Sequence, residues 1–261
     1  MRKYTSLNNY FQKTNHLISD NGDIKFNNQK TNINGKNKTK SSQKWLHRQL
    51  NDPFTNAAKI EGYLARSAYK LLEIQHKYHI ITKQSKIVID LGCSPGSWSQ
   101  VILTNEKLAH INIIGVDLLP IKFQHHNLTY VQGDFEDSKI QKQIVQFLQR
   151  LDDKKKQIQA DCIICDIAAN ATGNSEIDRI RSERIIEAVL AFSIKHLVHK
   201  GNLVCKAIKG ADNAVFKTMK EMFTNVYRFK PKSSRADSSE LFLIGLHKKP
   251  RSYHSTHESA L

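Results

Sequence analysis

The sequence predicts an α/β fold in which helices cover both faces of a mostly parallel β-sheet. Residues 87–89 are Ile-Val-Ile, a β-branched apolar run that is typical of a strand buried on both faces. A turn of small residues follows at 92–96, and the stretch from Trp98 to Leu108 has helical character. A strand, a tight turn and a helix in this order form the opening unit of a nucleotide-type α/β site.

The turn after this strand indicates which ligand such a site would hold. Its spacing, Asp90-x-Gly92-x-Ser94-x-Gly96, departs from the Gly-x-Gly-x-x-Gly that lets a backbone approach a pyrophosphate. A carboxylate here would repel phosphate but would suit a cationic ligand such as S-adenosylmethionine, which carries an ammonium and a sulfonium group. An ordinary turn in some other doubly wound protein is the alternative, and this stretch alone does not decide between the two.

Length and charge limit the remaining possibilities. A chain of 261 residues can hold one sizeable core, and we expect no second full domain. The 40 Lys and Arg against 24 Asp and Glu give a net charge of +16. This excess favours a polyanionic partner, nucleic acid before an anionic membrane surface, and carries no information about the fold.

The four cysteines lie in or beside expected strands, at Cys93, Cys162, Cys165 and Cys205. Cys162 and Cys165 have CxxC spacing, but residues three apart on a strand point to opposite faces. We therefore expect no metal site and no redox pair. Buried thiols in a reducing compartment are the interpretation that we favour.

The two ends of the chain differ in amino-acid composition from its middle. Residues 1–43 are polar and basic, and we expect a mostly disordered tail that adds nonspecific phosphate contacts or has no role. The folded domain is expected at 44–248, followed by a C-terminal tail at 249–261. Without an apolar leader or a run of membrane-spanning length, the sequence predicts a soluble, cytoplasmic protein with no membrane partner.

The first expected element after the Asn51-Asp52-Pro53 turn is a long helix. Apolar residues recur at helical spacing from Ala57 to Ile74, so one face should pack on the core. Lys59, Arg66 and Lys70 are basic positions on this element, and a solvated cation is the default interpretation for each. Lys70 differs because it stands beside Tyr69, just ahead of the first strand.

Aspartates follow four of the expected strands, at Asp90, Asp117, Asp134 and Asp166. Asp117 lies 21 residues after Gly96, where nucleotide folds place a carboxylate that binds ribose hydroxyls. Asp134 could reach an adenine amino group. Ligands of open α/β sheets bind outside the carboxyl ends of the strands, so we expect the four carboxylates to gather there. The strands that precede the last three are expected at 111–116, 128–131 and 160–165.

The second half of the chain begins with a helix that Ser175 and Asp178 are expected to cap. Its expected core stripe is Ile177, Ile180, Ile186, Val189, Leu190, Ile194 and Leu197, and Gly201 is expected to end it. A strand at 202–205 then terminates in Lys206, whose pKa of about 10.4 partial burial could lower. A basic, hydroxyl-rich loop at 229–235 and Glu240 precede the last apolar strand.

Taken together, these residues resemble the FtsJ/RrmJ (RlmE) family of ribosomal RNA 2'-O-methyltransferases. The stretch 45–53 is similar to bacterial members in particular. The match runs in the family's order from Trp45 to about Lys248. The matching stretches are 66–71, 90–100, 117–120, 132–135, 166–170, 204–206 and 233–240.

This resemblance implies a Rossmann-like class I methyltransferase with a seven-stranded, mostly parallel sheet and S-adenosylmethionine as its cofactor. It places a catalytic set on Lys70, Asp166, Lys206 and Glu240. Together with the turn, it places cofactor contacts on Asp90, Gly92, Gly96, Trp98, Asp117, Asp134 and Asp166. The implied substrate is a uridine ribose in 23S rRNA, in the A-loop of an assembled 50S subunit, and we expect the enzyme to be a monomer.

A basic face is expected to hold the RNA by phosphate contacts, at Lys59, Arg66, Lys230, Lys232 and Arg235. The chain departs from the usual family pattern at Cys93-Ser94 and Ser97, and Ala169 replaces a proline; no charged participant is lost. Alternatives are a 2'-O-methyltransferase acting on tRNA or mRNA caps, and a noncatalytic RNA-binding factor in ribosome assembly with the same fold.

Overall fold

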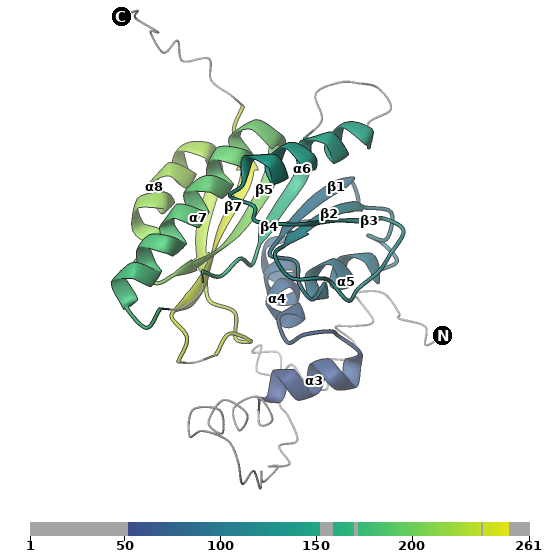
Figure 1. Cartoon of the computed structure of the whole chain (residues 1–261), viewed down its shortest axis with the longest axis horizontal. Helices are drawn as coiled ribbons and strands as arrows, with labels where there is room; N and C mark the ends of the chain where they lie inside the picture. Colours follow the sequence, from purple (N-terminus) through teal and green to yellow (C-terminus); the bar gives the residue numbers. More distant parts are fainter. Residues whose placement is uncertain (1–51, 152–158, 170–171, 236, 251–261) are drawn as a thin grey trace, which may run out of the picture.

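A computed structural model describes residues 52–151, 159–169, 172–235 and 237–250 of the chain (Figure 1). The expected basic tail at 1–43 and the expected start of the domain at 44 lie outside the described residues. So do the stretch 45–50 and the part of the expected C-terminal tail beyond residue 250.

Within the described residues the chain forms one seven-stranded sheet and six helices. The strands are β1 (Ile87–Leu91), β2 (Asn112–Asp117), β3 (Leu128–Gln132), β4 (Ala160–Cys165), β5 (Leu197–Ile208), β6 (Phe223–Phe229) and β7 (Glu240–Lys248). The helices are α3 (Pro53–Glu61), α4 (Ala68–Tyr78), α5 (Ser97–Leu103), α6 (Ser138–Arg150), α7 (Ser175–His196) and α8 (Asp212–Met222).

The strand order is β3-β2-β1-β4-β5-β7-β6, with β1 to β5 parallel and β7 antiparallel to both of its neighbours. The predicted seven-stranded, mostly parallel sheet is therefore confirmed. The order reverses between β1 and β4, because the chain first builds outward to β3 and then returns to the other side of β1. Such a switch point opens a crevice at the carboxyl ends of the strands, where ligands of this architecture bind.

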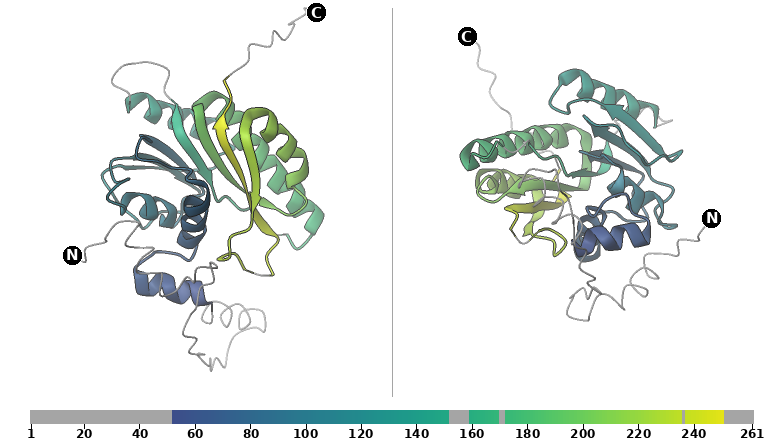
Figure 2. Two further views of the ribbon diagram at one scale, coloured as in Figure 1. Left: turned by 180° about the vertical axis from the view of Figure 1, so that it is seen from behind. Right: turned by 60° about the horizontal axis from the view of Figure 1, so that its bottom comes forward.

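Helices α6, α7 and α8 cover one face of the sheet, and α3, α4 and α5 lie on the other (Figure 2). Each face has its own apolar core. Successive strand residues point to opposite sides, so Val88 packs in the core under α4 and α5 while Ile89 packs in the core under α6 and α7. No described helix combines the length and the apolar character that crossing a membrane requires.

The cysteines follow the same alternation. Cys162 belongs to the core on the α4 side and Cys165 to the core on the α7 side, so the CxxC thiols face opposite ways as predicted. All four cysteines carry free, buried thiols, and burial raises the pKa of the Cys162 thiol. Among the described residues, no cluster of His, Cys, Asp or Glu is arranged to hold a metal ion.

The single long helix expected across 57–74 was wrong, because the structure has two helices there. Gly62 ends α3 with φ of 80°, a left-handed conformation that glycine adopts without steric cost. Ile60 is 82% exposed and Leu64 is 39% exposed, so the apolar stripe does not continue across the break. The break separates Lys59 on α3 from Lys70 on α4.

Helix α5 is also shorter than expected and ends at Leu103 rather than at Leu108. The Thr104 hydroxyl donates to the carbonyl of Gln100 at 2.7 Å, and the Asn105 side chain accepts from the Lys107 amide at 2.9 Å. Short polar side chains that bond to the nearby backbone in this way compete with helix continuation. The residues up to Leu108 form turns instead.

Helix α7 differs from the prediction at both ends. Asn174, not Ser175, is its N-cap, and the carboxylate of Asp178 instead binds Thr172. Ile177 and Ile180 are 42% and 55% exposed, and Ile194 is exposed as well, so these three do not belong to the core stripe. The first turns of α7 extend past the sheet, as Figure 1 shows.

Strand β5 begins at Leu197, so Gly201 lies inside the strand and does not end the helix. The strand also continues past Lys206, which was expected to terminate it. Pairing with β4 stops at Cys165 and Cys205, but pairing with β7 continues from Lys206 to Ile208. Lys206 is therefore held in extended backbone by β7 beyond the point at which β4 ends.

Lys248, at the end of β7, is buried and caps α7 from outside the helix. Its Nζ donates to the carbonyls of Ser193, Ile194 and Leu197 at 2.9, 2.7 and 2.6 Å. The carbonyls at the end of a helix carry partial negative charge and mostly lack an intrahelical partner, although the Ser193 carbonyl also accepts the Leu197 amide. The Lys248 ammonium donates hydrogen bonds to these carbonyls and also supplies the positive charge that complements their negative charge.

We expect Lys248→Met to lower the free energy of unfolding by about 2 kcal/mol, because three carbonyls lose a charged donor. Urea unfolding followed by circular dichroism measures the change. Lys249→Met is the matched control, since the exposed Lys249 ammonium donates to the Lys220 carbonyl at the surface and should matter by less than about 0.5 kcal/mol. Equal losses in the two variants would contradict the capping role.

Candidate active site

Four carboxylates lie along the carboxyl ends of β1 to β4. Asp90 is the fourth residue of β1, Asp117 ends β2, Asp134 follows β3 by two residues, and Asp166 comes directly after β4. The strands are parallel neighbours, so these ends share one edge of the sheet. Asp90 is close enough to Asp117 and Asp166 for both to act on its ionisation.

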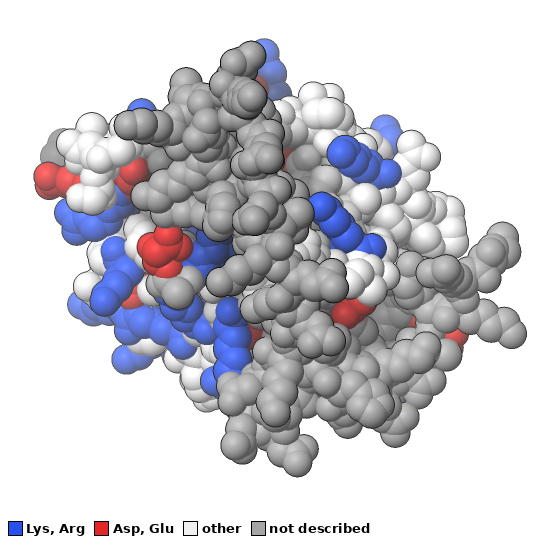
Figure 3. Space-filling model, turned by 90° about the horizontal axis from the view of Figure 1, so that it is seen from below, with Lys and Arg blue, Asp and Glu red and all other residues white. Residues whose placement is uncertain are grey.

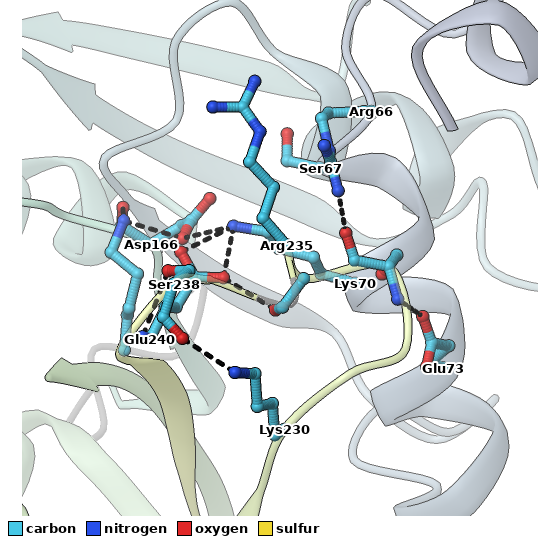
Figure 4. A network of polar contacts seen from close by, with 12 residues as sticks. Arg66, Ser67, Lys70, Glu73, Asp166, Lys230, Arg235, Ser238 and Glu240 are labelled. Atoms are coloured by element: carbon cyan, nitrogen blue, oxygen red, sulfur yellow. Dashed lines mark hydrogen bonds and ion pairs between the residues drawn. The ribbon is translucent and has the colours of Figure 1, made fainter. Parts of the chain in front are cut away.

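Beside Asp166, two lysines and a glutamate complete a network of ion pairs (Figure 4). The Nζ of Lys206 lies 2.9 Å from Asp166 Oδ1, and the Nζ of Lys70 lies 2.8 Å from Glu240 Oε2. Lys70 Nζ is also 3.9 Å from Asp166 Oδ1, which joins the two pairs. The structure thus brings together the four residues of the expected catalytic set.

Each member of this network comes from a different element. Lys70 lies in the first turn of α4, with its ammonium 5.7 Å from the centre of the Phe242 ring. The Asp166 amide donates to the carbonyl of Leu91 at 2.9 Å, which fixes the start of the loop after β4. Glu240 opens β7, and its Oε1 is 2.8 Å from the Ser234 hydroxyl.

The charges in the network stabilise one another. Burial by itself would lower the pKa of Lys206, but the Asp166 carboxylate and then Glu240 outweigh burial and raise this pKa. Burial by itself would raise the pKa of Glu240, but Lys70 and Lys206 outweigh it and lower this pKa. The expectation of a lowered Lys206 pKa was therefore wrong in its net direction: burial does oppose the charge, but its carboxylate partners outweigh burial and hold the amine as an ammonium ion.

Asp90 is in a different situation, because it lies inside the strand and is completely buried. Its Oδ2 accepts a hydrogen bond from the Ser99 hydroxyl at 2.7 Å, while Oδ1 has no hydrogen-bond partner among the described residues. Burial raises the pKa of Asp90 to about 7, although the bond from Ser99 opposes the shift. An unpartnered buried carboxylate oxygen is a place where a cationic or hydrogen-bonding ligand group would fit.

The small-residue turn keeps its backbone close to neighbouring segments. Gly92 has φ of +76°, and a Cβ there would lie 2.7 Å from the Ile167 amide nitrogen. Gly96 has φ of +104°, and a Cβ there would lie 2.6 Å from the Phe123 Cβ. Only glycine fits either position without displacement. With Asp90 beside the turn, this chain offers what a cationic methyl donor such as S-adenosylmethionine would need.

The remaining expected cofactor residues are placed as follows. Asp117 accepts a hydrogen bond from the Ser94 amide through Oδ2 and one from the Leu119 amide through Oδ1, each at 2.8 Å. It therefore links the turn after β1 to the turn after β2. Asp134 is exposed. Trp98 is buried, and its indole N–H donates to the Ser67 carbonyl at 2.8 Å, which ties the start of α5 to α4.

The five residues expected to contact RNA divide into two groups. Lys59, Lys230 and Lys232 are exposed, and Lys230 Nζ also donates to the Ser238 carbonyl at 2.7 Å. Arg66 instead pairs with Asp52 and donates to the Ser233 carbonyl, and Arg235 Nε lies 3.8 Å from the same aspartate. These two arginines therefore hold the loop after β6 against α3. Figure 3 shows Lys and Arg gathered over the left part of the face seen from below, on the side of α7 and α8.

Sequence reasoning missed the residue that fixes this loop from α4. The carboxylate of Glu73 accepts the backbone amides of Lys232 and Ser233 at 2.6 and 2.8 Å. Glu73 lies three residues after Lys70 and so shares a helix face with it, which is a signal that could have found it. The Ser234 hydroxyl on Glu240 left no comparable signal, because it depends on how the loop folds.

Comparisons with known proteins agree with one another. Residues 63–248 match the family model described as FtsJ-like methyltransferase. Ribosomal RNA large subunit methyltransferase E of Rickettsia akari is 39% identical over 219 residues, which cover 82% of this chain and 92% of the relative. The Rickettsia conorii protein of the same name is 38% identical with the same coverage. A crystal structure of a ribosomal RNA methyltransferase from Plasmodium falciparum superposes with a TM-score of 0.61 at 29% identity, covering 72% of this chain and 100% of that one.

Asp90→Asn should make the protein more stable than wild type above pH 7. The Asp90 pKa is about 7 in the folded protein and about 3.9 in an unfolded chain. Between these values the folded state holds a proton that the unfolded state has released, so this group makes stability fall as pH rises. Asparagine carries no such proton.

The advantage of the Asp90→Asn variant should therefore be near zero at pH 4 and a few kcal/mol at pH 8. Urea unfolding at pH 4, 5, 6, 7 and 8 measures it. A difference between variant and wild type that stays constant over this range would show that Asp90 does not hold a proton near neutral pH in the fold.

Proposed function

The chain belongs to the FtsJ-like methyltransferase family, and on this premise we propose that it transfers a methyl group from S-adenosylmethionine to a uridine 2'-hydroxyl in large-subunit ribosomal RNA. The proposal rests on one observation: two ion pairs, Lys206 with Asp166 and Lys70 with Glu240, are in contact with each other at the carboxyl ends of the strands. The names of the relatives support the RNA class. The A-loop of the assembled 50S subunit, implied by the family resemblance, is the proposed location.

When bound, the cofactor supplies an electrophilic methyl group on a sulfonium centre. Asp90 would hold its ammonium group, Asp117 its ribose hydroxyls and Asp134 its adenine amino group. Gly92 and Gly96 keep the turn narrow enough for the ligand to lie against the backbone, and the Trp98 indole ties the helix that follows the turn to the start of α4. Asp166 stands between this edge and the lysines.

Lys206 acts mainly by position. Its raised pKa keeps Nζ protonated, so the ammonium donates to the acceptor oxygen and holds it in line with the methyl group. Asp166 fixes the direction of that ammonium, and the Lys70–Glu240 pair keeps the surrounding charge balanced. Because Lys206 is already protonated, the hydroxyl proton would pass to a carboxylate of the network such as Asp166, and this carboxylate and the ammonium groups beside it titrate as a coupled unit.

The RNA is held mainly through its phosphates. The net charge of +16 and the exposed Lys59, Lys230 and Lys232 provide contacts that do not depend on sequence. Lys230 and Lys232 lie on the loop that Glu73 and Ser234 fix beside Glu240, so phosphate contacts there are coupled to the position of the catalytic set.

The deciding experiment incubates the full chain with labelled S-adenosylmethionine and 50S subunits from a strain that lacks the corresponding methylation. Free 23S rRNA, 30S subunits, tRNA and capped mRNA are incubated in parallel. We expect label on one uridine 2'-oxygen of 50S subunits. Label on tRNA or on the cap would replace the substrate, and no label together with no heat of cofactor binding in calorimetry would favour a noncatalytic assembly factor.

Lys206→Ala should reduce turnover by a factor of about 100 or more, because the acceptor oxygen loses its positioning donor. Cofactor affinity by calorimetry should change less than about threefold. Lys209→Ala is the matched control, an exposed lysine three residues further along the same segment. Near-normal turnover of Lys206→Ala would rule out the assignment.

Replacing Lys230 and Lys232 together by alanine should make RNA binding less dependent on salt. Two phosphate contacts fewer should reduce the slope of log affinity against log salt by about 2. The control pair is Lys139 and Lys142 on α6, which removes the same charge from a different part of the surface. If both pairs change the slope equally, net charge rather than the loop accounts for binding.

A further inference from the structure

A cavity of about 180 Å³ adjoins the ion-pair network on the side of β5, β7 and α7. Lys206 and Glu240 form part of its wall, together with Ser182, Ser238 and Ile185. A water molecule takes about 30 Å³ of liquid, so the space is large enough for more than a single bridging water.

The cavity lies on the opposite side of the network from the cofactor edge. In the strand order, the acids at 90, 117 and 134 lie at the carboxyl ends of β1, β2 and β3, whereas the cavity is built around β5 and the start of β7. Asp166 and Lys206, which follow β4 and extend β5, stand between the two. A donor group and an acceptor group placed on the two sides would meet at Lys206.

Two serine hydroxyls in the cavity wall each have a hydrogen left to donate. Ser182 Oγ accepts from the Ile208 amide at 3.3 Å, and Ser238 Oγ accepts from the Glu240 amide at 3.1 Å. Neither hydroxyl donates to an acceptor among the described residues. Ser193, on the same helix as Ser182, shows the usual alternative, because its hydroxyl donates to the Val189 carbonyl at 2.7 Å.

The covalent structure of a nucleotide explains why a cavity beside Lys206 suits a base. The base and the 2'-hydroxyl are attached to adjacent carbons of the ribose. When the 2'-oxygen is held at Lys206, the base must therefore lie close to Lys206 as well. Apolar walls from Ile167 and Ile185 suit the faces of a base, and hydroxyl donors suit its carbonyl groups. Uracil presents carbonyls at positions 2 and 4, whereas cytosine presents a carbonyl at position 2 and an amino donor at position 4, so the two bases differ as acceptors only at position 4.

We propose that this cavity receives the base of the nucleotide that is methylated, and that the hydroxyls of Ser182 and Ser238 donate to its carbonyl groups and thereby favour uracil over cytosine. The inference rests on the proposed function and adds to it the residues that select the base. A site whose buried donors need carbonyl partners discriminates against an analogue that lacks one.

The test compares Ser182→Ala, Ser238→Ala and the control Ser193→Ala on 50S subunits that carry either uridine or cytidine at the methylated position. We expect Ser182→Ala and Ser238→Ala each to lower kcat/KM on uridine by about fivefold to tenfold, mainly through KM. For the serine that donates to position 4, the loss on cytidine should be smaller than on uridine by at least threefold; the serine that donates to position 2 should show similar losses on both, because both bases carry that carbonyl. Ser193→Ala should change kcat/KM less than twofold on both.

Cofactor affinity and urea midpoints identify a variant that has lost its fold. In that case the other serine variant decides, through its loss on uridine relative to Ser193→Ala. Equal losses on uridine and cytidine in both serine variants, or losses on uridine no larger than that of Ser193→Ala, would overturn the inference. If no variant methylates cytidine, the loss on uridine relative to Ser193→Ala decides. Failure of the wild type to methylate any 50S subunit would instead contradict the proposed function.

Discussion

The contact on which the rest of the site depends is the 2.9 Å ion pair between Lys206 and Asp166, joined to Lys70 and Glu240. Charges that are mostly removed from water are stable when they are paired, and removing one partner leaves the other uncompensated. The four segments must therefore meet in one arrangement. Pairing of β5 with β7 as far as Ile208 and Glu240 brings two of the charges into register, and the first turn of α4 supplies a third.

The polar contacts around this network fix the positions of the loop before β7 and of the glycine turn. Glu73 and Ser234 fix the loop before β7, Arg66 ties the same loop to α3, and Trp98 ties α4 to the glycine turn. Positioning accounts for much of the catalysis of a reaction whose electrophile is already activated. Asp90 is the exception, because a buried carboxyl with a raised pKa costs stability, and its unpartnered oxygen belongs to the proposed ligand site.

The reversal of strand order explains how the two halves of the site stay apart. The acids that suit a cationic donor lie at the carboxyl ends of β1 to β3, while the cavity with its serine hydroxyls is built around β5, β7 and α7. Strand β5 runs past the end of β4, so Lys206 projects between the two halves and can act on a group held from either side. In the proposed reaction, one amine therefore serves both substrates.

The sequence by itself determined the alternation of strands and helices, the carboxylates at the strand ends and the opposite faces of Cys162 and Cys165, because these follow from period and local spacing. It also placed the four charged residues of the network, through their resemblance to a family. Tertiary structure decided what depends on distant partners: Lys70 and Glu240 are separated by 170 residues. The raised pKa of Lys206, the engagement of Arg66, the exposure of Ile177 and the cavity beside Glu240 all arise from such contacts, which no local pattern encodes.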